Sequence, residues 1–512
     1  MKKVFSLILV IAMIFSLSIT AFAADVTVSV NGEIISDHTF SGYMILDGDY
    51  DAENQNLSNI QWGNGINSAD FLAALKADTE IGSYFAACTD ASSVAEVISS
   101  FSSDSTEIRT FSKIACANVN TANAVVISTS TTSLENGYYL VVDTTEVQGQ
   151  DKAANASILQ VVGENVDINL KTDKPFVEKK VMENVKWTNN GGYNDVADWN
   201  IGDNVPFRVT SKVPDMTYYD EYTMIFHDTL DAGFTLNSDS ITVKIGNVNL
   251  VKDTDYTVTQ DGQSFDVQII NLKNIAGITA GNAITVDYTA LLNTNAVIGL
   301  DGNENVVYLE YSNAPDSTGT GSSANLTGKT PEDKVIVFTY GTEITKVDGA
   351  DTSITLKGAE FILKNADGTK YAIVTDGLFT EWTTDETAAT YLTTDENGVA
   401  LVKGLDDGTY LIEEIAAPAG YNAIVGDKTI VIEAITDNGD SWDGVASSAL
   451  INIANDADSD ALVDVQVINN KGAVLPETGS NGTALFITVG FVMVLAAVVI
   501  LVVRKKMSVY ED

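Results

Sequence analysis

Short runs of alternating apolar and polar residues dominate the middle of the chain and predict β-strands. Val26, Val28 and Val30 form the first such run, and similar runs recur as far as residue 469, separated by turn residues. Ser68 to Lys76 differs, because its spacing is that of a short helix. Short strands with turn signals at regular spacing are typical of β-sandwiches. The pattern therefore predicts an all-β fold made of tandem β-sandwich domains.

Changes in this pattern divide the middle of the chain into three expected domains. Residues 24–172 open with the valine run. Residues 173–340 open with a strand that begins at Phe176, and residues 341–472 open with the alternating strand Ile344 to Asp348. A length of 512 residues is enough for three domains of ordinary size.

The N-terminus has the pattern of a secretory signal peptide over residues 1–23. Lys2 and Lys3 precede an apolar run that is followed by Ala21-Phe22-Ala23. Small residues at alternate positions before a cleavage point suit signal peptidase, so we expect the mature chain to begin at Ala24. The bulk of the chain is then exported.

The C-terminus has the pattern of a membrane anchor. Residues 483–503 are apolar, Gly or Thr throughout, which is long enough for a transmembrane helix. The tail 504–512 begins with Arg504-Lys505-Lys506, and positive charge stays on the cytoplasmic side. Directly before this segment, residues 475–479 read Leu475-Pro476-Glu477-Thr478-Gly479.

Composition excludes several classes of function. With 28 basic and 70 acidic residues the net charge is −42, which argues against nucleic-acid binding, because that affinity comes mainly from Lys and Arg. No His-x-x-Glu-His or Gly-x-Ser-x-Gly motif occurs, and so many carboxylates make chance pairs uninformative, so we do not expect an enzyme.

Two cysteines and two histidines are too few for a disulfide framework or a Cys/His metal site. In an exported chain Cys88 and Cys116 have two readings, a pair or free thiols. Asp47, Asp49 and Asp51 do not continue into a calcium loop, because the later Gly and Glu are absent. We expect no cofactor and no metal site, and weak metal binding by acidic loops stays open.

The motifs together resemble those of a Gram-positive surface protein family. Leu475 to Gly479 is similar to the LPXTG sorting signal, and it is followed in the usual order by a spanning helix and a basic tail. Residues 341–472 resemble a Cna-B-type domain through Lys346-Val347-Asp348 and through Tyr410-x-Ile412-x-Glu414-x-x-Ala417-Pro418-x-Gly420-Tyr421. From end to end the chain resembles a sortase-assembled major pilin with immunoglobulin-like, Cna-type β-sandwiches.

The resemblance implies internal isopeptide bonds, in which a Lys on the first strand of a domain joins an Asn on the last strand with the help of an acid. Periodicity on each strand then selects the residues that face inward. In the middle domain these are Lys179 and Asn313, and the acid that the resemblance implies is Asp228. In the third domain they are Lys346 and Asn469, whereas Asn470 lies on the other face, and the acid that the resemblance implies is Glu414. No Lys occurs between Ala24 and Lys76, so we expect no such bond in the first domain.

The resemblance also implies a bond between subunits. A pilin sortase would attack the carbonyl of Thr478, release Gly479 and pass the acyl group to a Lys of another copy. Lys171 keeps the spacing of the family's linking Lys, although the Tyr, Pro and Asn of the family motif are absent, and Lys174 is the alternative. Pro476 keeps the signal extended and accessible.

These features predict a structural shaft subunit of a covalent pilus on the cell wall of a Gram-positive bacterium. The expected partners are a pilin sortase, a housekeeping sortase, further copies of the chain, minor pilins and peptidoglycan. The alternative is a monomeric adhesin that the same signal fixes to the wall. The host ligand is not encoded in any motif of the sequence.

Overall fold

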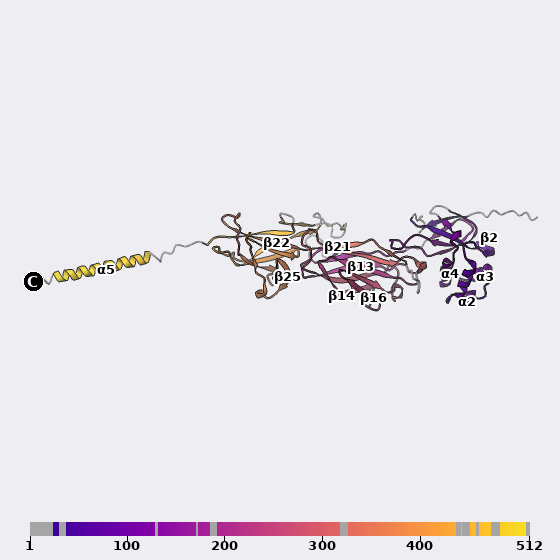
Figure 1. The fold of residues 1–512 in the computed structure, drawn as a ribbon, viewed down its shortest axis with the longest axis horizontal. Coiled ribbons are helices and arrows are strands. Elements are labelled where there is room, and N and C mark those ends of the chain that lie inside the picture. Colours follow the sequence, from indigo (N-terminus) through magenta and orange to yellow (C-terminus); the bar gives the residue numbers. More distant parts are fainter. Residues whose placement is uncertain are drawn as a thin grey trace, which may run out of the picture.

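The molecule is a row of three β-rich regions followed by a separate helix (Figure 1). The computed structural model describes residues 24–507 apart from 30–36, 128–131, 170–172, 185–191, 318–325, 437–441, 443–450, 457–459 and 473–481. We call residues 24–172, 173–340 and 341–472 the N-terminal, middle and C-terminal regions. The signal peptide, Lys171 and the sorting signal 475–479 therefore lie outside the described residues.

The N-terminal region combines two small sheets with a group of helices. One sheet has the order β3-β2-β6-β7, with β4 paired to β2, and the other has the order β5-β1-β8. Its strands are β1 Ala24–Ser29, β2 Phe40–Asp51, β3 Asn56–Trp62, β4 Val125–Ile127, β5 Thr132–Leu134, β6 Gly137–Asp143, β7 Ile158–Val162 and β8 Val166–Asn169.

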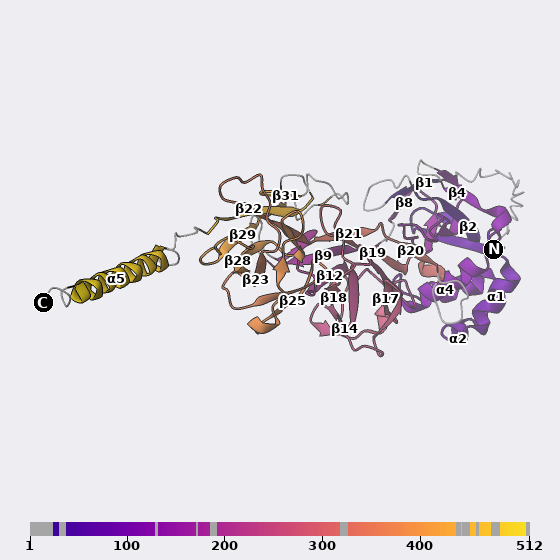
Figure 2. The same cartoon turned by 60° about the vertical axis from the view of Figure 1, so that its left-hand side comes forward.

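Four helices lie between β3 and β4, where the sequence pattern predicted one. They are α1 Ser68–Ala77, α2 Gly82–Phe85, α3 Ala91–Ile98 and α4 Thr106–Ala117. The predicted helix corresponds to α1. The other three are short, and short helices owe their stability mainly to tertiary packing. That packing is an aromatic cluster in which Phe111 contacts both Phe71 and Phe85. Figure 2 shows α1, α2 and α4 together on one side of this region.

The middle region is a sandwich of two mostly antiparallel sheets, with the orders β10-β9-β12-β18-β14-β15 and β11-β21-β19-β13-β17-β16. Alternate residues of its strands are buried, and they form one core between the sheets. The strands are β9 Glu178–Glu183, β10 Gly192–Asn194, β11 Val196–Asp198, β12 Asn204–Lys212, β13 Met224–Leu230, β14 Phe234–Ile245, β15 Val248–Asn249, β16 Tyr256–Asp261, β17 Ser264–Ile269, β18 Ala283–Leu292, β19 Asn303–Ser312, β20 Thr327–Lys329 and β21 Asp333–Phe338.

In the C-terminal region the first and last strands lie side by side. They are β22 Tyr340–Asp348 and β32 Leu462–Asn469, which pair in parallel with Lys346 opposite Val467. The large sheet has the order β29-β28-β23-β24-β25-β27-β22-β32. Its other strands, with the small pair β30 and β31, are β23 Glu360–Asn365, β24 Tyr371–Thr375, β25 Leu378–Thr383, β26 Leu392–Thr393, β27 Val399–Leu405, β28 Gly408–Ala416, β29 Lys428–Ile432, β30 Ala434–Thr436 and β31 Ile451–Ile453.

The middle and C-terminal regions share part of their packing. Val196 of β11 and Ile336 and Phe338 of β21 belong to the hydrophobic core of the C-terminal region, although their strands pair in the middle region. This packing joins the two regions without a separate linker. Mostly-β structure with sandwich packing agrees with the fold class expected from the sequence.

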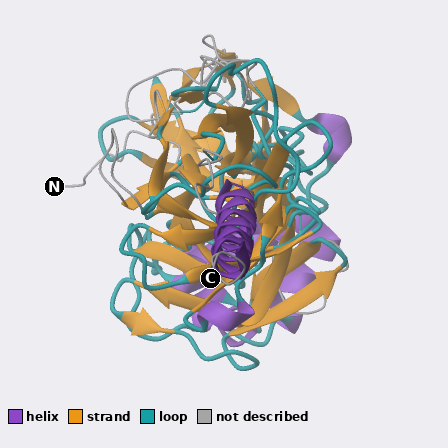
Figure 3. Cartoon of the chain, turned by 90° about the vertical axis from the view of Figure 1, so that its left-hand side faces the viewer, coloured by secondary structure: helices purple, strands orange, loops and turns teal. Residues whose placement is uncertain are grey.

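Helix α5 Gly482–Met507 stands apart from the three regions. Phe486–Lys505 is long and apolar enough to cross a membrane, and none of that segment is buried in the protein. Viewed along the row of domains, α5 lies in front of the strands as a single rod (Figure 3). This helix agrees with the predicted anchor over residues 483–503.

Candidate functional site

The middle region buries a lysine, a carboxyl and a tyrosine in direct contact. Lys179 of β9 is 0% exposed and Asp228 of β13 is 2% exposed. The Lys179 Nζ atom donates to Asp228 Oδ2 at 2.5 Å and to the hydroxyl of Tyr288 at 2.8 Å, and that hydroxyl donates to Asp228 Oδ2 at 2.8 Å. The sequence placed Lys179 and Asp228 in one core, and the structure brings them into contact.

Burial shifts both charged partners towards their neutral forms. It lowers the pKa of Lys179, and the nearby Asp228 opposes that shift. Burial also raises the pKa of Asp228, although Lys179 pulls that pKa down. The rings of Phe207 and Tyr288 lie 5.7 Å and 5.3 Å from Lys179 Nζ and keep its surroundings apolar. The pocket thus favours a neutral amine next to a neutral carboxyl.

The amide beside this pair is Asn305, not Asn313. Asn305 of β19 is fully buried, and its Nδ2 atom donates to the Tyr288 hydroxyl at 2.8 Å. A single hydroxyl therefore contacts both the Lys179 amine and the Asn305 amide. Asp228 and Asn305 are close because β13 and β19 are paired, with Asp228 opposite Val307.

Asn313 faces the N-terminal region. Its Nδ2 atom donates to the carbonyl of Val147 at 2.5 Å and to that of Lys152 at 2.9 Å. Eight residues of nearly extended chain separate it from Asn305, roughly 26 Å at the rise of a strand. The expected pairing of Lys179 with Asn313 is therefore corrected. The prediction chose the correct face of the strand, but it chose an asparagine eight residues too far along the chain.

The C-terminal region brings its three predicted residues together. Lys346 of β22 is fully buried, and its Nζ atom contacts Asn469 Oδ1 and lies 2.9 Å from Glu414 Oε1. The Nδ2 atom of Asn469 also donates to Glu414 Oε1, at 2.8 Å. Burial lowers the pKa of Lys346, and Glu414 opposes that shift. Asn470, the rejected candidate, is exposed.

Each pocket thus holds an amine, a carboxyl and a side-chain amide in one dry core. These three groups can exchange an amide for a new amide with loss of ammonia. Tyr288 and Asn305 were missed by the sequence reasoning. The sequence pattern does point to Asn305, because alternation places it on the same face of the strand as Val307, Leu309 and Asn313.

Lys174, the alternative linking lysine, lies at the joint between the N-terminal and middle regions. Lys171 is outside the described residues. Lys174 is partly exposed, and its amine donates to Asp151 Oδ2 at 2.6 Å and to the Asp151 carbonyl at 3.0 Å. It lines a cleft of about 580 Å³ together with Asp151, Pro175 and Phe176. Cys88 and Cys116 are both free thiols in the structure.

Comparison with known proteins finds matches to three family models. Residues 201–315 match the Gram-positive pilin backbone subunit 2, Cna-B-like domain. Residues 341–442 match the prealbumin-like fold domain, and residues 468–508 match the LPXTG cell wall anchor motif.

Individual relatives agree with these matches. The trypsin-resistant surface T6 protein of Streptococcus pyogenes serotype M6 is 23% identical over 402 residues, which are 66% of this chain and 70% of that protein. The solved T6 backbone pilin of the same serotype has the same fold, with a TM-score of 0.55, 17% identity and coverage of 88% and 99%. The group B streptococcus pilus 2b backbone protein matches 55% of this chain and 97% of its own at 26% identity, with a TM-score of 0.41.

Proposed function

Because the chain belongs to the Gram-positive backbone pilins and carries an LPXTG cell-wall anchor, we propose that it is the shaft subunit of a covalent pilus. In this proposal a pilin sortase joins Thr478 of one copy to Lys171 of the next. A housekeeping sortase then attaches the finished polymer to peptidoglycan, and minor pilins add to it. The precursor is held in the membrane by α5.

The observation that carries the proposal is the repeated buried set of lysine, acid and asparagine in two successive regions. In each set the neutral amine attacks the side-chain carbonyl carbon of the asparagine, while the acid donates a proton to the carbonyl oxygen. The C–N bond to the amide nitrogen then breaks, and ammonia leaves with a proton from the amine. The products are one new amide and one ammonia, with the acid restored.

We assign the residues of each bond from the contacts. The middle region would form Lys179–Asn305 with Asp228 as the acid, in place of the Lys179–Asn313 pair expected from the sequence. The C-terminal region would form Lys346–Asn469 with Glu414 as the acid. In each case the acid contacts the lysine directly, and Glu414 also contacts the amide that must be polarised.

The two bonds would make the shaft resistant to pulling. Lys346 and Asn469 are 123 positions apart, and cross-linking a loop of that length stabilises a fold by about 4–5 kcal/mol if the entropy model for disulfides applies. A strand held only by hydrogen bonds can be peeled away by force, whereas a covalent link between first and last strands keeps the load on the backbone.

Lys171 remains our first choice for the linking lysine, with Lys174 as the alternative. The Lys174 amine is held by two oxygens of Asp151, and it would have to leave both to attack an acyl-enzyme. An arginine at either position keeps the charge and removes the nucleophile.

We expect Lys171→Arg to abolish the SDS-resistant ladder of polymers in cell-wall extracts, because the acyl group of Thr478 then has no acceptor on the next subunit. Lys174→Arg and Lys152→Arg are matched controls and should leave the ladder intact. Immunoblotting of wall extracts measures the outcome. A ladder that survives Lys171→Arg and is lost in Lys174→Arg would transfer the role to Lys174, and a single wall-linked band in the wild type would support the monomeric adhesin instead.

A further inference from the structure

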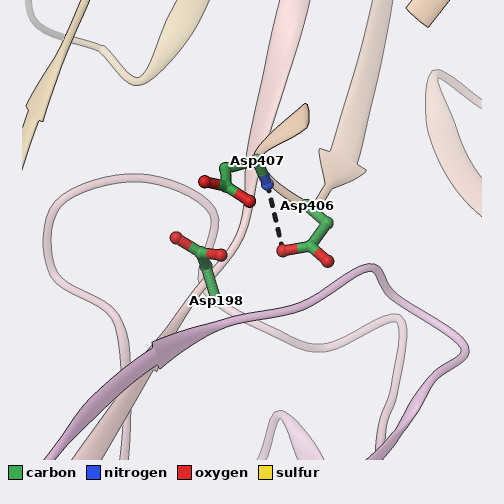
Figure 4. Close-up of side chains that lie close together, drawn as sticks. All are labelled: Asp198, Asp406 and Asp407. Carbon is green, nitrogen blue, oxygen red and sulfur yellow. Dashed lines mark hydrogen bonds between the residues drawn. The ribbon is translucent and has the colours of Figure 1, made fainter. Parts of the chain in front are cut away.

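Three aspartates from distant parts of the sequence meet where the middle and C-terminal regions join. Asp198 ends β11, while Asp406 and Asp407 form the turn between β27 and β28. All three are buried, with exposed fractions of 3%, 5% and 7%. One carboxylate oxygen from each lies within 4.8 Å of the others, and Figure 4 shows the carboxyl groups of Asp198 and Asp407 turned towards each other.

Several contacts hold these side chains in place. Tyr340 donates its hydroxyl hydrogen to Asp198 Oδ2 at 3.0 Å, and Asn184 Nδ2 donates to Asp406 Oδ2 at 3.0 Å. The backbone N–H of Asp407 donates to Asp406 Oδ1, also at 3.0 Å. Protein donors therefore hold the carboxyl groups of Asp198 and Asp406 in place.

Two of the carboxylate oxygens in the cluster have no such partner. Asp198 Oδ1 and Asp407 Oδ1 are buried and accept no hydrogen bond from the described residues. Buried carboxylate oxygens are normally satisfied, because leaving one bare costs the full desolvation penalty. Two bare oxygens that belong to the same cluster mark a place where a positively charged group fits.

The described residues supply no cation to the cluster. Among the described residues, no Lys, Arg or His forms an ion pair with Asp198, Asp406 or Asp407. Burial raises the pKa of all three carboxyl groups, and mutual repulsion among them raises the pKa of Asp406 and Asp407 further, that of Asp407 to about 9. Three carboxylates without a counter-charge are unstable at neutral pH unless protons or a metal ion neutralise them.

We propose that Asp198, Asp406 and Asp407 bind one Ca²⁺ ion that fastens the middle region to the C-terminal region. Carboxylate oxygens are the ligands that hard divalent cations prefer, and the cluster contains no sulfur or imidazole. Two oxygens that share a Ca²⁺ at about 2.4 Å are at most about 4.8 Å apart, and the oxygens of the cluster lie within that limit.

The ion would connect two elements that carry load between the regions. Asp198 belongs to β11, which pairs with β21, and β21 runs into β22, the strand that carries Lys346. The turn that carries Asp406 and Asp407 leads into β28, the strand that carries Glu414. Calcium would thus stiffen the joint directly between the two proposed isopeptide pockets. This proposal does not depend on either isopeptide bond.

The test uses the ectodomain, residues 24–478, stripped of metal and titrated with CaCl₂ and with MgCl₂ by calorimetry. We expect one Ca²⁺ per chain with a Kd of about 0.1–1 mM, the range of extracellular modules, and weaker Mg²⁺ binding. About 10 mM Ca²⁺ should raise the Tm by roughly 3–8 °C. Tyr340 and Tyr410 are close enough to sensitise luminescence of Tb³⁺ in the same site.

Variants separate this site from the many surface carboxylates. Asp407→Asn and Asp198→Asn should each weaken Ca²⁺ binding at least tenfold and remove the Tm shift, whereas the exposed control Glu381→Gln should change neither. Binding with unchanged affinity in both aspartate variants would overturn the proposal, as would absence of both calcium heat and Tb³⁺ luminescence in the wild type. The wild-type measurement decides the matter even if a variant fails to fold.

Discussion

Glu414→Gln is expected to leave Lys346 and Asn469 unjoined. The C-terminal region should then lose most of the stability that the Lys346–Asn469 bond would add. The ectodomain should then weigh about 16 Da more than the wild type, because one ammonia of about 17 Da is retained and the substitution itself removes about 1 Da. Glutamine keeps the shape of the side chain, but it cannot pass a proton to the Asn469 carbonyl. Lys346 would stay a buried free amine opposite an intact amide.

The expected loss of stability follows from the loop that the bond closes. Cross-linking residues more than a hundred positions apart is worth about 4–5 kcal/mol, which corresponds to a fall in Tm of roughly 10–20 °C for a region of this size. Acidification cannot imitate this effect, because an amide bond does not titrate between about pH 4 and about pH 9.

Glu413→Gln is the matched control, because Glu413 is the adjacent residue on the opposite face of β28. Its carboxylate pairs with Lys364 at 2.6 Å near the surface, and a pair of that kind contributes no more than about 1 kcal/mol. Intact-mass spectrometry and calorimetric unfolding measure both variants. Glu414→Gln protein without this gain in mass would show that Glu414 is not the acid of the reaction.

The structure brings Lys346 and Asn469 into contact, as the sequence pattern predicted, and the reason is geometric. Alternation decides which face of a strand a residue occupies, and both residues lie near the C-terminal ends of strands that pair in parallel. They therefore lie at a similar level of the sheet. Glu414, the proposed acid, was chosen through the motif around it and not through periodicity.

The same reasoning failed for Asn313, because alternation shows which face of a strand a residue occupies but not its position along the strand. Asn305 and Asn313 share one face of the chain, and only the pairing of β19 with β13 shows which of them lies beside Asp228. The proposed calcium site could not be predicted from the sequence, for a related reason. Asp406 and Asp407 read as an ordinary turn, and nothing in the sequence indicates that Asp198 packs against them.

Asn305→Ala is expected to prevent the bond in the middle region, whereas Asn313→Ala should leave it in place. Both substitutions remove the same side chain from the same face of the chain, so their comparison isolates position along the strand. The Asn305 variant lacks the amide next to Lys179 and should keep Lys179 as a free amine. The mass deficit of the ectodomain, about 34 Da for two bonds, should fall to about 17 Da in this variant.

The two variants should also fail at different places when they are heated. Loss of the Lys179–Asn305 bond should lower the stability of the middle region by about 4–5 kcal/mol. Asn313→Ala removes two hydrogen bonds to the N-terminal region and should cost about 1–3 kcal/mol at that joint, with the mass deficit unchanged. Peptide mapping locates the cross-link. A Lys179 peptide joined to one that contains Asn313, or a full deficit in Asn305→Ala, would reverse the assignment, because an alanine at position 305 offers no carbonyl for the amine to attack.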